Sequence, residues 1–144
     1  MTRHRPMRAD DAAAVASLTT ELGYAVDPDE MAARIVPLLG RDDHLLLVAT
    51  DPQDRPIGWM HVVRYATLET SERAVIAGII VDESARSSGI GRGLVEAGEA
   101  WARAAGVPSM LVRSRSTRTR AHRFYERIGY VETKRSHVFE KPLV

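Results

Sequence analysis

The sequence of 144 residues is 44% hydrophobic and 27% charged, a composition typical of one globular domain. It has no cysteine, which excludes disulfide frameworks, thiolate zinc sites and thiol catalysis. The net charge of +1 hides a division, because residues 1–112 carry −5 and residues 113–144 carry +6. No apolar run approaches the roughly 20 residues of a membrane span, and the N-terminus lacks the apolar core of a signal peptide, so we expect a cytoplasmic protein without membrane contact.

Two helices are predicted in the N-terminal quarter, after a short strand. The first follows Asp10-Asp11, has apolar residues at helical spacing and ends at Gly23. The second begins at Asp27-Pro28-Asp29-Glu30. Here Asp is the N-cap, Pro takes the first helical position and Glu completes a capping box.

The rest of the chain alternates between strand and helix patterns. Three apolar segments separated by polar turns, at residues 44–50, 56–63 and 74–81, predict an antiparallel meander. The elements predicted after it are a helix at residues 91–105, a strand at 109–113, a helix at 117–128, and two strands at 130–133 and 136–141. The order β-α-α-β-β-β-α-β-α-β-β predicts an α/β fold in a single domain, 1–144, with a mixed sheet of about seven strands and about four flanking helices.

A glycine-rich segment lies between the meander and the long helix. It contains Gly89, Gly91 and Gly93, flanked by Arg86 and Arg92. Glycine permits positive φ and close approach of a ligand, and the amides of a helix N-terminus favour phosphate. The spacing G-x-G-x-G is not the dinucleotide fingerprint, and no Lys-Ser/Thr follows as in an NTPase loop. The segment therefore predicts an anion site of another kind, with a tight turn that tolerates glycine as the alternative.

The motif Arg86-Ser-Ser-Gly89-Ile-Gly91 resembles the Arg/Gln-x-x-Gly-x-Gly/Ala signature of the GNAT superfamily of N-acetyltransferases. The resemblance covers nearly the whole chain, including the block from Ala121 to Tyr130. It implies a sheet splayed open between strands that end near Val81 and Val112, with acetyl-CoA in the cleft. The cofactor-binding residues that it implies are Ile79, Ile80, Val81, Arg86, Ser87, Ser88, Gly89, Ile90, Gly91, Arg92 and Phe124.

The resemblance also implies direct transfer of the acetyl group to an amine. Such a reaction needs a neutral amine and a proton donor for the leaving thiolate. Tyr125 matches the tyrosine that serves the family as general acid. Because Phe124 precedes it and Ile128 lies one turn later, a simple core aromatic is the alternative for Tyr125.

The general base is less clearly marked. Val75 stands near the position where many relatives carry a glutamate. Glu69 and Glu72 lie just upstream, and Glu72 is the first candidate for the base. The alternatives are His61, His122, His137 and bulk water. Arg115 stands where related sequences often have an asparagine that faces the cofactor, so we assign it no such role.

Other classes of function fit the sequence less well. The five histidines have no metal-ligand spacing, so no metal is expected. Arg118, Arg120 and Arg123 predict a solvated helix face, with a contribution to CoA phosphate binding as the alternative. A nucleic-acid surface fits less well, because no aromatic platform accompanies them. The functional alternative is a GNAT-fold domain that binds acyl-CoA without catalysis, as a sensor or assembly module.

The acceptor is predicted only as a primary amine of a small molecule or a peptide. Five acidic residues would attract such a cation or serve as ordinary helix caps: Asp27, Asp29, Glu30, Glu69 and Glu72. Members of the family dimerise, and a homodimer is a further partner that the sequence leaves open.

Overall fold

The structure of the protein is a computed structural model that describes residues 3–144. These residues form two compact units, one that ends at Arg113 and a second, Ser114–Val144. The assignment of the whole chain to a single domain stays a prediction. Among the described residues, no helix is both long and apolar enough to cross a bilayer.

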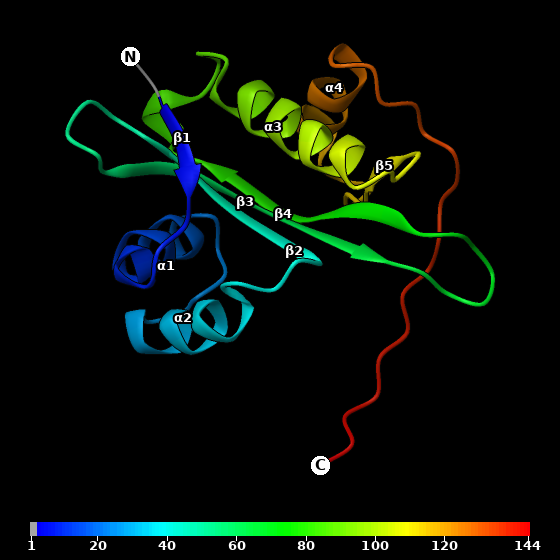
Figure 1. Cartoon of the computed structure of the whole chain (residues 1–144), viewed down its shortest axis with the longest axis horizontal. Helices are drawn as coiled ribbons and strands as arrows, with labels where there is room; N and C mark the ends of the chain where they lie inside the picture. Colours follow the sequence, from blue (N-terminus) through cyan, green and yellow to red (C-terminus); the bar gives the residue numbers. More distant parts are fainter. Residues whose placement is uncertain (1–2) are drawn as a thin grey trace. The chain divides into compact units, whose positions relative to one another are not determined.

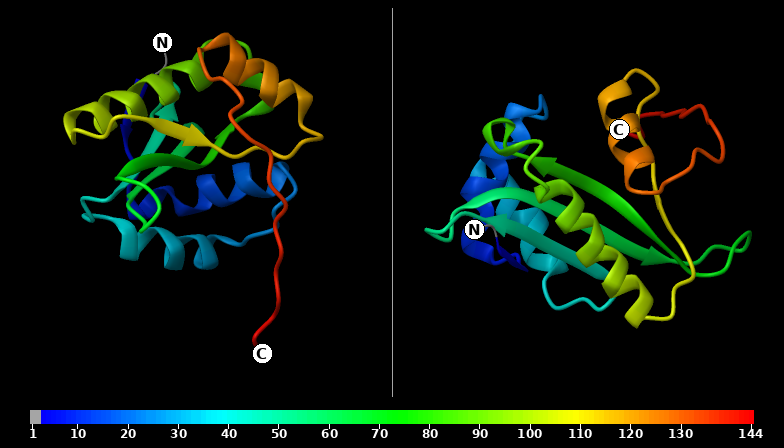
Figure 2. Two further views of the ribbon diagram at one scale, coloured as in Figure 1. Left: turned by 90° about the vertical axis from the view of Figure 1, so that its right-hand side faces the viewer. Right: turned by 90° about the horizontal axis from the view of Figure 1, so that it is seen from above.

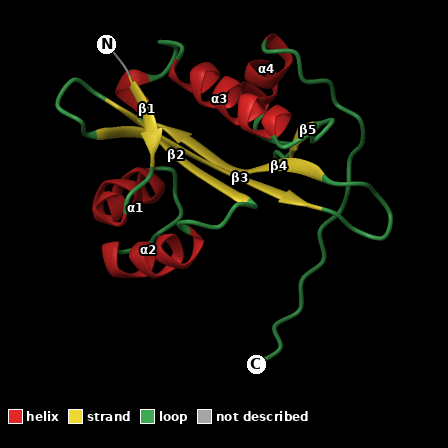
Figure 3. Ribbon diagram, viewed as in Figure 1, coloured by secondary structure: helices red, strands yellow, loops and turns green. Residues whose placement is uncertain are grey.

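The first unit contains all five strands and three of the four α-helices (Figures 1 and 3). In chain order its elements are β1 (Arg3–Pro6), α1 (Ala12–Glu21), α2 (Pro28–Ile35), β2 (His44–Thr50), β3 (Pro56–Tyr65), β4 (Arg73–Val81), α3 (Ile90–Ala104) and β5 (Met110–Val112). Short 3-10 helices cover Ala9–Asp11, Val36–Leu38 and Glu83–Ala85. The second unit contains α4 (Thr119–Arg127). This order agrees with the prediction as far as α4.

The sheet has the strand order β1-β2-β3-β4-β5. The pairs from β1 to β4 are antiparallel, whereas β5 is parallel to β4. Helix α3 covers one face of the sheet, and α1 and α2 cover the other (Figure 2). The sheet is therefore mixed and lies between two helical layers, as the alternation of elements predicts.

Side chains along β3 point alternately to the two faces of the sheet, so that one set packs against α3 and the other against α1. Met60 and Val62 are fully buried, and Met60 approaches α3 so closely that a Cβ on Gly98 would lie 2.8 Å from its Cε. Trp59 points to the opposite face, where its indole N–H donates to Thr19 Oγ1 of α1 at 3.2 Å. Side chains two residues apart on a strand share a face, so β3 packs on both helical layers.

The start of α2 confirms the predicted capping box. The backbone N–H of Glu30 donates to Asp27 Oδ1 at 2.8 Å, and the N–H of Asp27 donates to Glu30 Oε1 at 3.5 Å. Pro28 opens the helix, where its missing N–H leaves no hydrogen bond unmade.

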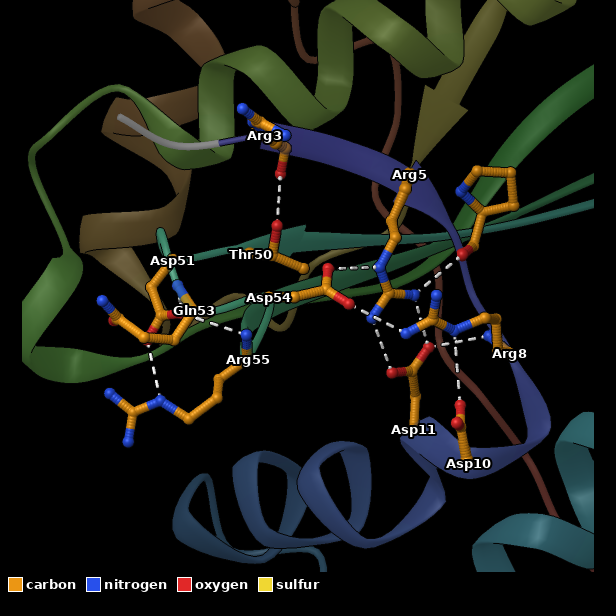
Figure 4. Close-up of polar contacts among 11 residues, drawn as sticks. Arg3, Arg5, Arg8, Asp10, Asp11, Thr50, Asp51, Gln53, Asp54 and Arg55 are labelled. Atoms are coloured by element: carbon orange, nitrogen blue, oxygen red, sulfur yellow. Dashed lines mark hydrogen bonds and ion pairs between the residues drawn. The ribbon is translucent and has the colours of Figure 1, made fainter.

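A network of charged side chains ties β1 to α1 and to the β2–β3 turn (Figure 4). Arg5 makes two hydrogen bonds to the carboxylate of Asp11, at 2.8 and 2.9 Å, and a third to Asp54 Oδ1 at 2.9 Å. Arg8 donates to the other carboxylate oxygen of Asp54 at 2.9 Å. Because Asp11 is buried, this network fixes the edge strand on the first helix.

The prediction of two C-terminal strands is wrong. Residues 130–133 and 136–141 form neither strand nor helix, so the described sheet has five strands rather than about seven. The side chain of Phe139 is 92% exposed and that of Val131 is 81% exposed. A strand pattern shows that a segment can pair, but pairing also needs a neighbouring strand, which the pattern does not provide.

Candidate functional site

The sheet opens where β4 and β5 separate. Their parallel pairing covers three residue pairs and ends at Ile76 with Val112. Beyond that point β4 continues through residues 77–81 and pairs with β3 alone. Within the part of the chain that the structure describes, no strand pairs with the other edge of residues 77–81. That edge runs along Ile79, Ile80 and Val81, where an extended ligand would meet backbone groups that no strand of the described chain occupies.

A β-bulge marks the separation. His61 of β3 lies opposite Gly78 and Val62 lies opposite Ile76, so Ala77 has no residue opposite it. Such a bulge bends its strand and increases the local twist. The bend explains why β4 leaves β5 at this residue. Apart from the adjacent glycine, no local sequence signal predicts it.

The loop after β4 folds back on the end of the strand. The Asp82 carboxylate accepts hydrogen bonds from the backbone N–H and the hydroxyl of Ser84, at 2.9 and 2.8 Å. Arg86 Nε donates to the carbonyl of Val81 at 3.2 Å, and the hydroxyl of Ser88 donates to the carbonyl of Ala85. These contacts hold the glycine-rich segment beside the free edge of β4.

Helix α3 begins without a side-chain cap. Its N-cap is Gly89, which has φ of 86°, and no side chain accepts from the first turn. The first intrahelical bond at this end runs from the N–H of Gly93 to the carbonyl of Gly89, at 3.0 Å. The amides of Ile90, Gly91 and Arg92 precede it and have no intrahelical acceptor. These amides are the kind of donors that an anion site at a helix N-terminus uses, and the anion site itself stays a prediction.

The residues around these amides set the local charge and conformation. Ser87 has φ of 67°, a left-handed conformation that is uncommon for serine. Arg92 forms an exposed ion pair with Glu96, at 3.0 Å, on the side of the helix. Gly93 has a packing role, because a Cβ there would lie 2.5 Å from Cε1 of His4. Gly93 is therefore required by its contact with β1, whereas Gly89 supplies the left-handed residue that begins the helix.

Tyr125 and Phe124 lie on α4, in the second unit. Their rings meet edge to face with centroids 5.2 Å apart, and Tyr125 also contacts the ring of Tyr130 at 6.0 Å. Burial raises the pKa of Tyr125 above its usual value of 10, and the positive charge of Arg118 opposes this shift. The phenol is therefore protonated at neutral pH, as a proton donor must be.

The structure places the candidate bases at separate positions. Glu72 is exposed in the turn immediately before β4. His61 lies on β3, where its Nε2 is 2.8 Å from Nδ1 of His44. His122 Nε2 is 2.8 Å from the carbonyl of Arg115, and the His137 ring stacks on Phe139 with centroids 6.5 Å apart.

The acidic residues near α2 take part in local hydrogen bonds. The N–H of Glu30 lowers the pKa of Asp27, and the two side chains complete the capping box described above. A hollow of about 330 Å³ lies between α1 and α2. Its lining is mostly apolar and consists of Ala13, Ala16, Ser17, Thr20, Glu21, Val26 and Pro28. No group of three or more His, Asp or Glu within residues 3–144 is arranged to hold a metal ion.

Comparison with known proteins agrees with this geometry. The sequence model of the Acetyltransferase (GNAT) family matches residues 12–130. An aminoglycoside N(6')-acetyltransferase type 1 from Stenotrophomonas maltophilia is 30% identical over 137 residues, which cover 92% of this chain and 88% of that protein.

Two solved structures are close in fold. The aminoglycoside 6'-N-acetyltransferase AAC(6')-Ih from Acinetobacter baumannii superimposes with a TM-score of 0.87 at 22% identity, over 100% of both chains. A transcriptional regulator from Bacillus halodurans gives a TM-score of 0.87 at 20% identity, over 98% of this chain and 100% of that one. At these identities the likeness shows a shared fold.

Proposed function

Because the chain belongs to the GNAT acetyltransferase family, we propose that it is an acetyl-CoA-dependent N-acetyltransferase that acts on a primary amine. The observation that carries this proposal is that two features follow each other in the chain, one on β4 and one at the start of α3. A free strand edge at residues 77–81 leads directly into the uncapped amides at the start of α3. Together they match the two halves of the family's donor, an extended arm with amide groups and a pyrophosphate.

The residues present fit acetyl-CoA. The backbone of Ile79, Ile80 and Val81 would pair with the amide groups of the arm, as a strand would. The pyrophosphate would bind the amides of residues 87–92, with positive charge from Arg86 and Arg92. Phe124 is proposed as a further contact of the donor, on the strength of the sequence motif alone.

The proposed reaction is direct aminolysis of the thioester. The nitrogen lone pair of the neutral amine attacks the carbonyl carbon, a C–N bond forms and the C–S bond breaks. The thiolate takes a proton from Tyr125, and the surplus proton of the amine passes to Glu72 or to water. The first assignment requires a phenol that is protonated at neutral pH, and the raised pKa of Tyr125 is compatible with this requirement.

The experiment that tests this function is an acetyl-transfer screen that follows the release of free CoA thiol. The chain contributes no thiol background, because it contains no cysteine. The panel includes amino acids, peptides, simple amines and an aminoglycoside. We expect thiol release that depends on the amine, together with an acetylated product. Binding of acetyl-CoA without amine-dependent release would favour a sensor or assembly domain, and absence of binding would overturn both functions.

A further inference from the structure

Three side chains meet on one face of the sheet, at the end remote from the glycine-rich loop. Tyr65 is the last residue of β3 and lies directly opposite Arg73, the first residue of β4. Arg113 follows β5, and its terminal nitrogen NH2 is 3.4 Å from the Tyr65 hydroxyl. Since β3 and β5 flank β4, the side chains of Tyr65 and Arg113 meet over β4. We call these three residues the Tyr65 cluster.

The Tyr65 cluster lies on the α1–α2 face of the sheet. Side chains at alternate positions of a strand share a face, so Tyr65 lies on the same face as Trp59 and His61. Trp59 hydrogen-bonds to α1, which identifies that face. The cluster is thus on the same side of the sheet as the hollow between α1 and α2, and on the opposite side from α3.

The positive charge of the cluster is not balanced. Arg5 and Arg55, both drawn in Figure 4, each pair with a carboxylate within 4.0 Å. Over residues 3–144, no carboxylate lies within that distance of Arg73 or Arg113. The Nε of Arg73 is buried and has no hydrogen-bond partner in the described chain. Hydrogen bonding to Arg113 lowers the pKa of Tyr65, and the charges of both arginines add to this effect.

The cluster is also remote from the end of β4 that faces the proposed pyrophosphate site. Arg73 and Val81 are the two ends of a strand of nine residues. Eight steps of about 3.3 Å separate their Cα atoms by roughly 26 Å. Arg113, in contrast, follows the last β4–β5 pair and therefore stands beside Ala77, where the two strands separate.

We propose that the Tyr65 cluster binds an anionic group of the acceptor, a carboxylate or a phosphate, so that the acceptor is an amine that also carries negative charge. This inference rests on the proposed function and adds the substrate class to it. Two arginines and a phenol supply the charged and neutral donors that carboxylates and phosphates require. A polycationic acceptor would instead meet two uncompensated guanidinium groups. The charge of the acceptor thus distinguishes this chain from its aminoglycoside-acetylating relative.

The test compares acceptors that carry the same amine with and without a negative charge. An amino acid is set against its carboxamide, an O-phosphorylated amino acid against the unphosphorylated form, and an aminoglycoside serves as the polycation. The variants are R73Q, R113Q and the double variant, with R34Q as an exposed control on α2. We expect the double variant to raise KM for the anionic acceptors at least about tenfold and to leave KM for the carboxamide unchanged.

Three outcomes would overturn the inference. The first is that the wild-type enzyme uses the carboxamide or the aminoglycoside as well as it uses the amino acid. The second is that the double variant raises KM equally for charged and uncharged acceptors. The third is that R34Q changes KM as the double variant does. KM for acetyl-CoA is measured in each variant. A rise confined to acetyl-CoA would assign the cluster to a phosphate of the donor and would also overturn the proposal.

A binding experiment separates failure of the inference from failure of the proposed function. Calorimetric titration of the same amino acid and of inorganic phosphate, without acetyl-CoA, reports on the cluster independently of catalysis. If no amine is acetylated, the proposed function fails. Binding that the double variant abolishes would then still establish the anion site, whereas absence of binding would reject it.

Discussion

Nδ1 of His44 lies 2.8 Å from Nε2 of His61, and the two imidazole rings stack with centroids 5.1 Å apart. A hydrogen bond between two ring nitrogens requires one donor and one acceptor, so at least one of the two rings is neutral. Burial lowers the pKa of His61, and the proximity of His44 lowers it further. Asp43 is the nearby carboxylate, with Oδ1 4.0 Å from His44 Nε2. Full protonation of the pair would break their contact.

The histidine pair predicts a loss of stability on mild acidification. An unfolded histidine takes up its proton near pH 6.5, whereas folded His61 does so at lower pH. The unfolded state therefore binds more protons as the pH falls through this range, and the free energy of unfolding decreases. Urea denaturation between about pH 7.5 and 5.5 measures the slope. We expect H61Q to flatten it and H137Q, at an exposed site, to leave it unchanged; equal slopes in both variants would contradict the prediction.

Loss of the charge on Asp11 is expected to destabilise the first unit. The D11N variant would leave Arg5 partly buried and short of an acceptor, at a cost of about 3 kcal/mol. The matched control is D10N, because Asp10 pairs with Arg8 at 3.3 Å on an exposed surface. Such a pair is worth about 0–1 kcal/mol. Chemical denaturation of both variants gives the comparison, and equal losses would show that the Arg5–Asp11 contact has no special weight.

The Asp11 carboxylate also predicts acid sensitivity at lower pH. Burial raises its pKa, but hydrogen bonds from Arg5 and from the N–H of Arg8 outweigh burial, so the net pKa is lowered. The stabilisation is therefore complete above the unfolded value near 4 and is lost as the pH falls through the folded value. In D11N this part of the pH dependence should be absent.

Replacement of Gly89 by alanine tests the loop at the start of α3. Gly89 has φ of 86°, and Gly23 has φ of 107°, and a Cβ at either site meets nothing within 4 Å. Alanine at both sites should therefore cost a similar amount of stability, about 1 kcal/mol, from backbone strain alone. Only G89A should weaken binding of acetyl-CoA, measured by calorimetry. Equal affinity in G89A and G23A would remove the loop from the proposed donor site.

Removal of the Tyr125 hydroxyl tests the proposed proton donor. We expect Y125F to lower kcat by about a hundredfold and to leave KM for acetyl-CoA nearly unchanged, because protonation of the thiolate contributes to the chemical step. Y130F is the control, since Tyr130 belongs to the same aromatic cluster. If kcat of Y125F equals that of the wild type, the thiolate takes its proton from water.

The features that can be predicted from the sequence are those that depend on a few neighbouring residues. The start of α2 depends on residues 27–30 alone, and its caps follow from their chemistry. The glycine-rich segment is predictable for the same reason, because Gly89 must supply the left-handed residue that begins α3. The positions of Tyr125 and Glu72 in the reaction remain predictions, since they depend on the family resemblance.

Features that depend on the pairing of distant strands are not predictable in this way. The bulge at Ala77 follows from the register between β3 and β4, which no residue near Ala77 specifies. The Tyr65 cluster combines residues 48 positions apart, and only the order of the strands brings them together. Residues 130–133 and 136–141 are the opposite case: they have a local strand pattern but no neighbouring strand to pair with, and they form no strand.

The free edge of β4 at residues 77–81 has a consequence for the protein when no ligand lies along it. An unpaired edge exposes amide hydrogens to exchange with solvent and offers a template for aggregation with another chain. A donor that lies along this edge would slow exchange of those amides and would prevent another chain from pairing with the edge. Hydrogen–deuterium exchange of residues 77–81 with and without CoA would measure the protection. Depletion of acetyl-CoA, the proposed donor, is thus expected to make the chain more prone to self-association, which would link its solubility to the supply of that donor.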